Sequence, residues 1–221
     1  MPDYFHSLVH LTFIGIIALF PVVNPIGSAL IVNHYFANIS RIDKRSVVMK
    51  ITLYAFLLCT VTLFAGHWIL ELFGISIPVI QVAGGIMICK TGWEFLTEGK
   101  PEDHSVDAGN KQITRSDLQE KLFFPITFPI TTGAGTMAVL FTLSAHSAND
   151  NITDYLFNSG ALVLSIIFTC AMVYFLYMNA ETLLRYAGSN GEKIINRIVA
   201  FLTFCVGLQI AVTGIKSIFR I

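Results

Sequence analysis

The sequence predicts an all-α membrane protein in which six transmembrane helices form two inverted repeats of three helices each. Three observations support this fold class. Of the 221 residues, 54% are hydrophobic and 13% are charged, and the mean hydropathy is +0.69, which is far too apolar for an ordinary soluble domain. A spanning helix needs roughly 20 apolar residues, and about six such segments account for most of the chain. A proline-glycine motif and a glycine motif also occur twice, in the same order.

The six expected segments follow one another with few polar residues between them. They run from about residue 8 to 33, 51 to 70, 79 to 95, 122 to 145, 155 to 178 and 198 to 215. Residues 33–50 form a polar connection, and Gly74 and Pro78 mark a tight turn before the third segment. We therefore expect one transmembrane domain, residues 1–221, made of repeat 1 (about 4–96), a cytoplasmic loop (about 97–121) and repeat 2 (about 122–220).

The proline-glycine motif is expected to break the first and fourth segments. It reads FPVVNPIGS at residues 20–28 and FPITFPITTGAGT at residues 124–136, and each copy lies within a stretch without Asp, Glu, Lys or Arg. A helical proline cannot donate to the carbonyl four residues earlier, so Pro21 and Pro25 would free the carbonyls of Ile17 and Pro21. Pro125 and Pro129 would likewise free those of Lys121 and Pro125. Broken backbone at membrane depth is buried in protein or lines a cavity, and in transporters it forms the substrate site. The alternative is a kink that serves only packing.

The glycine motif closes each repeat. Residues 85–92 and 207–214 both read GxxIxxTG. Small residues let helices approach closely, so the match has a simple packing explanation as well. Because each repeat contains three spans, the second copy would be inverted relative to the first.

Basic residues predict the orientation. They occur in the connections after the first, third and fifth segments and are absent after the second and fourth. By the positive-inside rule, the odd-numbered connections are cytoplasmic and both termini lie outside. The formal net charge is zero, with 14 basic and 14 acidic residues, so no basic face for nucleic acid is expected. The basic residues concerned are Arg41, Lys44, Arg45, Lys50, Lys100, Lys111, Arg115, Lys121, Arg185, Lys193 and Arg197.

The second half-helix of each broken segment is expected to begin at the membrane midplane, near Gly27 and near residues 133–136. Both positive helix ends would then point inward, where unpaired N–H groups suit a carboxylate. The candidate substrate-binding residues are Asn24, Gly27, Ser28, Thr127, Thr131, Thr132, Gly133 and Gly135. For Asn24 and the three threonines, an equally weighted alternative is that they only satisfy carbonyls freed by the prolines.

No catalytic residue, metal site or cofactor is predicted. Gly27 and Ser28 lack the flanking pattern of a nucleophile elbow, and no paired carboxylates occur in the spans. Gln81 and Gln209 are polar residues within apolar spans, for which interhelical hydrogen bonds are expected. The four cysteines lie in apolar runs without a CxxC pair, which favours packing over ligation. They are Cys59, Cys89, Cys170 and Cys205.

Several motifs carry a family resemblance: residues 24–27, 73–77, 83–86, the Pro125/Pro129 motif with residues 133–136, and residues 196–215. On these motifs the whole chain resembles the MarC family of six-span membrane proteins, also called the neutral amino-acid transporter family. The resemblance implies a bacterial inner-membrane location and, for some members, transport of small neutral amino acids. Two departures from the family pattern are Gln81, where a basic residue is common, and Ala134, where proline is common.

These observations predict a secondary membrane transporter of a small zwitterionic solute, a small neutral amino acid, bound at the midplane between the two broken helices. The expected partners are this solute and the lipid bilayer, without nucleic acid. The alternative is a non-transporting inner-membrane assembly or regulatory protein, and an intramembrane enzyme ranks third. Substrate identity, direction, coupling ion and oligomeric state stay open.

Overall fold

The computed structural model describes residues 2–36, 40–97, 121–147 and 152–219, and every regular element among them is a helix. The all-α class is therefore confirmed. The predicted loop at residues 97–121 lies almost wholly outside the described residues. The elements in chain order are α1 (Pro2–Val23), α2 (Pro25–Asn33), the short helix η1 (His34–Phe36), α3 (Arg41–Leu72), α4 (Ile77–Thr97), the wide-turned segment η2 (Leu122–Thr131), α6 (Ala134–Ser147) and α7 (Ile152–Phe219).

Four helical stretches in the described part of the chain are long and apolar enough to cross a membrane. They are His6–Val23, Arg41–Gly66, Thr153–Leu183 and Arg197–Phe219, and the pair Leu122–Thr131 with Ala134–Ser144, bent by 64°, would make a fifth. The 21-residue helix α4 is not among them, because Gln81, Lys90 and Glu94 lower its apolar character. The chain is thus an all-helical membrane protein with four or five candidate spans, and the six-span inverted repeat stays a prediction.

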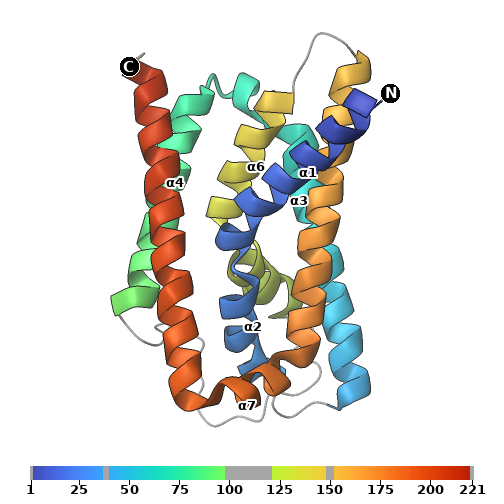
Figure 1. Cartoon of the computed structure of the whole chain (residues 1–221), viewed down its shortest axis with the longest axis vertical. Helices are drawn as coiled ribbons and strands as arrows, with labels where there is room; N and C mark the ends of the chain where they lie inside the picture. Colours follow the sequence, from blue (N-terminus) through green and yellow to red (C-terminus); the bar gives the residue numbers. More distant parts are fainter. Residues whose placement is uncertain (1, 37–39, 98–120, 148–151, 220–221) are drawn as a thin grey trace.

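Two helices are longer than the sequence pattern predicts. Helix α3 begins at Arg41 instead of residue 51, and the Ser40 hydroxyl caps it by accepting a 3.2 Å hydrogen bond from the Asp43 amide. The expected fifth and sixth segments both belong to α7, which stays helical through residues 179–197 and doubles back at one end of the molecule (Figure 1). Residues 41–50 and 179–197, which connect the expected segments, are therefore helical, and the two candidate spans of α7 still end at Leu183 and begin again at Arg197.

The helices surround the two breaks. Helix α4 and the C-terminal part of α7 lie side by side, while α1, α3 and the first part of α7 lie on the other side (Figure 1). Helices α2 and α6 occupy the space between, where α2 contacts α7 and η2, and α6 contacts α3 and α4. Both termini lie at the same end (Figure 1). This arrangement places the ends of α1 and η2 and the starts of α2 and α6 inside the bundle.

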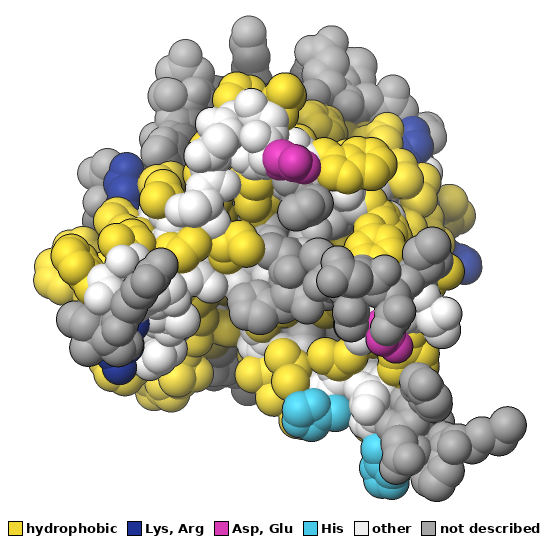
Figure 2. Space-filling view, turned by 90° about the horizontal axis from the view of Figure 1, so that it is seen from above, with side chains coloured by type: hydrophobic (Ala, Val, Ile, Leu, Met, Phe, Trp, Pro, Cys, Tyr) yellow, Lys and Arg dark blue, Asp and Glu magenta, His cyan; other side chains and the backbone are white. Residues whose placement is uncertain are grey.

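Two apolar clusters hold the interior together. Cluster 1 packs around α2 and comprises Val23, Ala29, Val32, Phe36, Val47, Val48, Ile51, Leu122, Ile126, Val173, Tyr177 and Ala180. Cluster 2 packs nearer the other end and comprises Leu19, Ala55, Cys59, Leu63, Ile88, Val139, Leu140, Leu162, Ile166 and Cys170. Many large apolar side chains remain exposed, such as Phe13, Trp68 and Phe175. Such exposure is typical of a protein whose sides face lipid. Seen from above, hydrophobic side chains lie between polar side chains and backbone (Figure 2).

The two copies of the glycine motif pack against each other, joining α4 to α7. A Cβ atom at Gly85 would lie 2.5 Å from the Ala211 nitrogen and 2.6 Å from the Gly207 oxygen. A Cβ atom at Gly207 would lie 2.8 Å from the Gly85 oxygen. Neither position has room for a side chain, so the two backbones touch.

The two glutamines within the apolar spans differ in burial. Gln81 is buried on α4, and its Cβ lies against Gly214 of α7. Gln209 is exposed, and its amide donates a long 3.5 Å hydrogen bond to Thr213 on the same helix. The expected interhelical bond of Gln209 is therefore wrong, because that residue faces outward.

Candidate functional site

The first break consists of one residue, Asn24, between α1 and α2. It is buried and has a φ of 45°, a left-handed conformation that Asn tolerates better than most residues. Its Oδ1 accepts a 3.0 Å hydrogen bond from the Gly27 amide, which caps the start of α2. A Cβ atom at Gly27 would collide with this Asn24 amide. The Asn24 side chain therefore binds one of the backbone N–H groups that were expected to bind a solute.

The carbonyl of Pro21, predicted to be freed by Pro25, accepts a hydrogen bond from a residue far away in the sequence. The hydroxyl of Thr203 on α7 lies 3.2 Å from the Pro21 oxygen and 2.8 Å from the Val199 oxygen of its own helix. Thr203 is only 2% exposed. Sequence reasoning missed this residue, although a buried carbonyl without a helical partner requires some donor.

The second break satisfies its own backbone. The hydroxyls of Thr127 and Thr131 each donate a 2.7 Å hydrogen bond, to the carbonyls of Leu122 and Ile126, and Thr132 donates at 3.0 Å to Thr127. Each bond reaches back five residues because the turns of η2 are widened. These are also different carbonyls from those expected for a regular helix. The alternative that these threonines support the backbone therefore accounts for all three.

The widening of η2 comes from two residues that precede its prolines. Phe124 and Phe128 have extended backbone conformations, with ψ of 125° and 123°, and both peptide bonds to the following proline are cis. The residue before a proline is generally pushed out of the helical region.

Tyr177 of α7 brings the two breaks together. Its Oη lies 2.8 Å from the Thr131 Oγ1 in η2, and because Thr131 donates to Ile126, the tyrosine donates this bond. The Ser28 hydroxyl of α2 also faces the Tyr177 hydroxyl, but the two groups form no hydrogen bond with each other. Tyr177 is fully buried. The sequence analysis missed it, although a tyrosine in the interior of an apolar helix normally has a polar partner.

Two buried hydroxyls near the starts of the half-helices have no hydrogen-bond partner among the described residues. Ser28 Oγ follows Gly27 in α2, and Thr136 Oγ1 follows Gly135 in α6. The two residues are 3% and 1% exposed. Thr136 was not among the predicted site residues. Asn33 Oδ1 and Thr60 Oγ1 are also unpartnered but lie elsewhere on α2 and α3.

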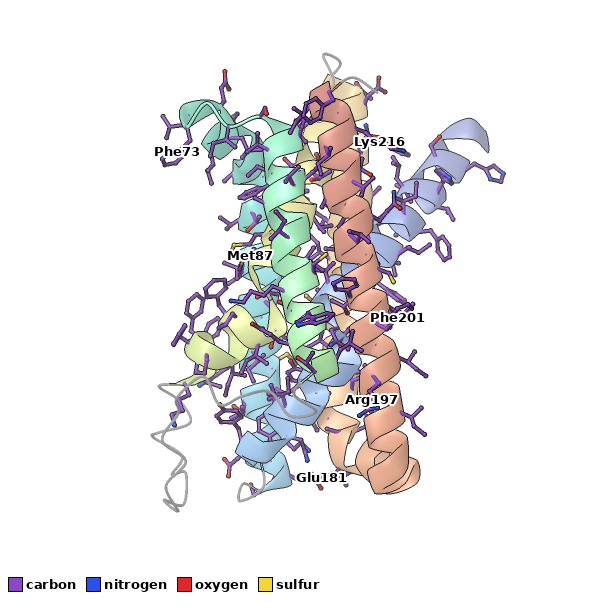
Figure 3. The ribbon with its side chains drawn as sticks, turned by 90° about the vertical axis from the view of Figure 1, so that its left-hand side faces the viewer. Phe73, Met87, Glu181, Arg197, Phe201 and Lys216 are labelled. Carbon is purple, nitrogen blue, oxygen red and sulfur yellow. The ribbon has the colours of Figure 1, made fainter. Side chains whose placement is uncertain are left out.

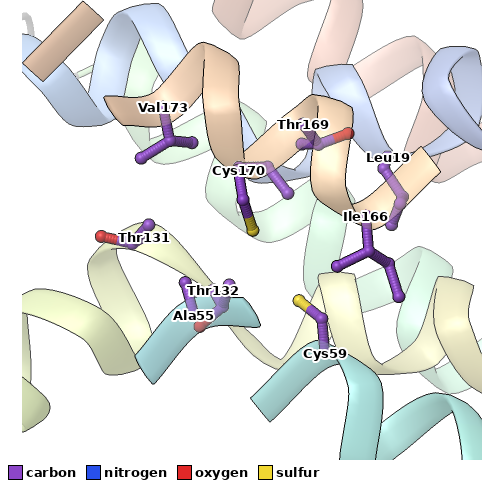
Figure 4. A pocket seen from close by; sticks show the side chains of 10 residues that line it. Leu19, Ala55, Cys59, Thr131, Thr132, Ile166, Thr169, Cys170 and Val173 are labelled. Carbon is purple, nitrogen blue, oxygen red and sulfur yellow. The ribbon is translucent and has the colours of Figure 1, made fainter. Parts of the chain in front are cut away.

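A small cavity lies between α1, α3, η2 and α7 (Figure 4). The methyl and aliphatic groups of its lining make it apolar, and it has room for about one water molecule. Of the predicted site residues, Thr131 and Thr132 line it. The lining residues are Leu19, Val23, Ala55, Cys59, Thr131, Thr132, Ile166, Thr169, Cys170 and Val173. The cavity is therefore too small for a solute larger than water.

The glycines of the second motif have unequal surroundings. A Cβ atom at Gly135 would lie 2.5 Å from Ile88 Cγ1 and 3.1 Å from Val22 Cγ1. A Cβ atom at Gly133 would meet only the Pro129 oxygen, at 3.1 Å. Ala134 begins α6 and is exposed. Gly135 is thus a packing position, and Gly133 is the one with space beside it.

The searched part of the chain holds no group of three or more His, Cys, Asp or Glu residues that could hold a metal ion. The four cysteines are free. The polar chemistry near the breaks consists of hydroxyl, amide and backbone groups, which suits recognition of a small polar solute by hydrogen bonds.

Comparisons with known proteins identify similar chains. The model of the MarC family integral membrane proteins matches residues 9–219. The UPF0056 inner membrane protein MarC of Escherichia coli O1:K1 / APEC is 26% identical over 216 residues, which cover 94% of this chain and 95% of the relative. The protein of the same name from Escherichia coli strain K12 is 25% identical with the same coverage. No solved structure matches.

Proposed function

The chain belongs to the MarC family of multi-pass inner membrane proteins, and from this premise we propose that it is a secondary transporter of a small zwitterionic solute, such as a small neutral amino acid. The relatives' names state a membrane location and no substrate. The proposal therefore depends on the groups that surround the two breaks.

The observation that carries the proposal is the pair of buried, unpartnered hydroxyls at Ser28 and Thr136. A buried hydroxyl without a partner costs about 1–3 kcal/mol, and a bound solute would remove this penalty. Each hydroxyl stands within the first turn of a half-helix, where the helix dipole favours a carboxylate. Asn24 and Thr127, whose side chains already serve the backbone, are assigned a supporting role. If it widens, the apolar cavity beside Thr131 and Thr132 would accept a small uncharged side chain.

We propose that the chain consists of two inverted repeats of three spans. When Gly85 is aligned with Gly207 and Gly92 with Gly214, Cys89 is aligned with Ala211 and Val82 with Phe204. The contact of Gly85 with Ala211 then corresponds to the contact of Gly207 with Cys89. In the same way, the contact of Gly92 with Phe204 corresponds to that of Gly214 with Val82. All four contacts occur. A pseudo-twofold axis through this interface would produce this reciprocity.

The distribution of charge supports the proposed orientation, with both termini outside. Glu181 and Arg197 lie near one end, and Phe73 and Lys216 near the other (Figure 3). The basic residues at the start of α3 belong to the same end as Glu181, because Lys44 forms an ion pair with it. By the positive-inside rule this end, opposite the termini, faces the cytoplasm.

The proposed mechanism is alternating access. The closed conformation seals the cavity, and rocking of one repeat against the other would open the breaks to each side in turn. We keep the prediction that the chain is not an enzyme, since this mechanism requires no bond to be made or broken.

Uptake into liposomes tests the proposal. Purified protein is reconstituted and supplied with labelled glycine, alanine and serine under imposed proton or sodium gradients. We expect uptake of at least one of them. We expect Ser28→Ala and Thr136→Val to reduce it roughly tenfold or more at low solute concentration, since each removes a hydrogen bond to the solute. Thr91→Val is the matched control, because Thr91 is exposed on α4 and bonds only within its own helix.

Two results would contradict the proposal. Absence of uptake across the panel in folded protein would favour the non-transporting assembly or regulatory protein. Unchanged uptake in Ser28→Ala and Thr136→Val would move the site away from the half-helix starts.

A further inference from the structure

A buried lysine links α3 to α7 at the end opposite the termini. Lys44 Nζ lies 2.8 Å from Glu181 Oε1 and 5.5 Å from the centre of the Phe36 ring. The Lys44 side chain is 6% exposed, whereas that of Glu181 is 68% exposed. Lysine is almost never this deeply buried unless it is paired.

The ion pair is connected to the proposed site by packed side chains. Phe36, Val47 and Val48, next to Lys44, belong to cluster 1, and so do Tyr177 and Val173. Along α7, Glu181 is one turn from Tyr177, and Tyr177 is one turn from Val173, which lines the cavity. A continuous column of side chains therefore runs from the ion pair, through the tyrosine that joins the breaks, to the cavity.

The unequal exposure of the two partners determines how the pair can separate. Glu181 is already mostly hydrated, so it loses little when it moves away. Lys44 is surrounded by apolar groups, and its ammonium can leave Glu181 only if water enters beside Phe36 and Val48. Separation of the pair and hydration of this end of cluster 1 are therefore one event.

We propose that the Lys44–Glu181 pair is the latch of a gate that closes the solute site towards the end opposite the termini, and that the latch releases when α3 and α7 separate. This inference rests on the proposed transport function. It adds to that function the pairing that keeps the buried Lys44 charge free of water while this side is closed.

Two native cysteines report on the gate. Cys59 and Cys170 line the cavity and are buried, so their thiols are protected from a water-soluble maleimide while the gate is closed. Cys89→Ala and Cys205→Ala remove the other two thiols. The experiment measures the rate of maleimide labelling of Cys59 and Cys170 in purified protein in lipid nanodiscs, where reagent reaches both faces.

The latch predicts a pattern across three variants. Glu181→Gln leaves the Lys44 charge without its partner, so water enters and labelling accelerates roughly tenfold or more. Lys44→Met removes the charge that needs water and keeps an apolar chain on Phe36, so labelling stays at or below the starting rate. The double variant Lys44→Met/Glu181→Gln returns to that low rate. Glu94→Gln, which breaks the exposed Lys90–Glu94 pair within α4, is the matched control and leaves labelling unchanged.

The inference is overturned if folded Glu181→Gln labels no faster than its parent, if the double variant labels as fast as Glu181→Gln, or if Lys44→Met by itself accelerates labelling. The comparison of Lys44→Met with its parent remains decisive even if Glu181→Gln is not monodisperse. Labelling requires no transported solute, so the outcome is separable from the transport proposal. The predicted pattern without uptake of any solute would leave the latch in place and remove the transport function.

Discussion

The two broken helices carry related sequence motifs, but different groups hold them in shape. The first break is one capped residue, Asn24, whose neighbouring carbonyl receives a hydrogen bond from Thr203 on α7. The second break uses the hydroxyls of its own threonines, which bond carbonyls five residues earlier. What the two share is a buried, unpartnered hydroxyl directly after a glycine, at Ser28 and at Thr136. The supports thus differ between the halves, while the groups proposed to meet the solute are alike.

Valine at Gly135 should have the largest effect on stability. The added side chain would collide with Ile88 of α4 and Val22 of α1, so we expect a loss of about 2 kcal/mol or more, the usual penalty of overpacking. Gly133→Ala, whose Cβ would meet only the Pro129 oxygen at 3.1 Å, should cost less, about 1 kcal/mol. Thermal unfolding in detergent measures both. Equal destabilisation by the two variants would show that the second break is packed uniformly.

Removal of the Asn24 cap should be the next largest effect. Asn24→Ala loses the bond to the Gly27 amide and strains a backbone with positive φ, so we expect a loss of about 1–2 kcal/mol. Asn24→Gly, which tolerates that φ, should recover part of the loss. The check is the midpoint of thermal unfolding for both variants. Wild-type stability in Asn24→Ala would refute the capping role.

A smaller effect is expected when the first break loses its remote donor. Thr203→Val leaves the Pro21 carbonyl without its hydroxyl partner, which should cost about 1 kcal/mol. Thr213→Val is the matched control on the same helix, because Thr213 is exposed and bonds only Gln209. It should change stability by less than about 0.5 kcal/mol. If the two variants were equally stable, the carbonyl would have to be satisfied in another way.

Sequence pattern predicted the breaks because proline acts locally. The expected starts of the half-helices, near Gly27 and residues 133–136, correspond to the observed starts at Pro25 and Ala134. Proline removes a donor wherever the chain places it, so no tertiary information is needed. The MarC family resemblance is confirmed over residues 9–219.

Groups far apart in sequence were not predictable in the same way. Thr203 and Tyr177 become partners of the breaks only because the two limbs of α7 pack beside them, which no local pattern indicates. The carbonyls that the threonines of η2 satisfy depend on the extended conformations of Phe124 and Phe128. In a regular helix, Pro125 and Pro129 would instead free the carbonyls of Lys121 and Pro125.

The measurement that tests the central claim most directly is solute-dependent stabilisation of the wild type and of the double variant Ser28→Ala/Thr136→Val. These hydroxyls make no hydrogen bond to the described residues, so removing both should leave the unfolding midpoint without solute unchanged or slightly raised. We expect a small neutral amino acid to raise the midpoint of the wild type in a concentration-dependent way, and to have no effect on the double variant at the same concentrations. Equal stabilisation of both proteins would contradict the account, because the solute would then bind without the two hydroxyls at the half-helix starts.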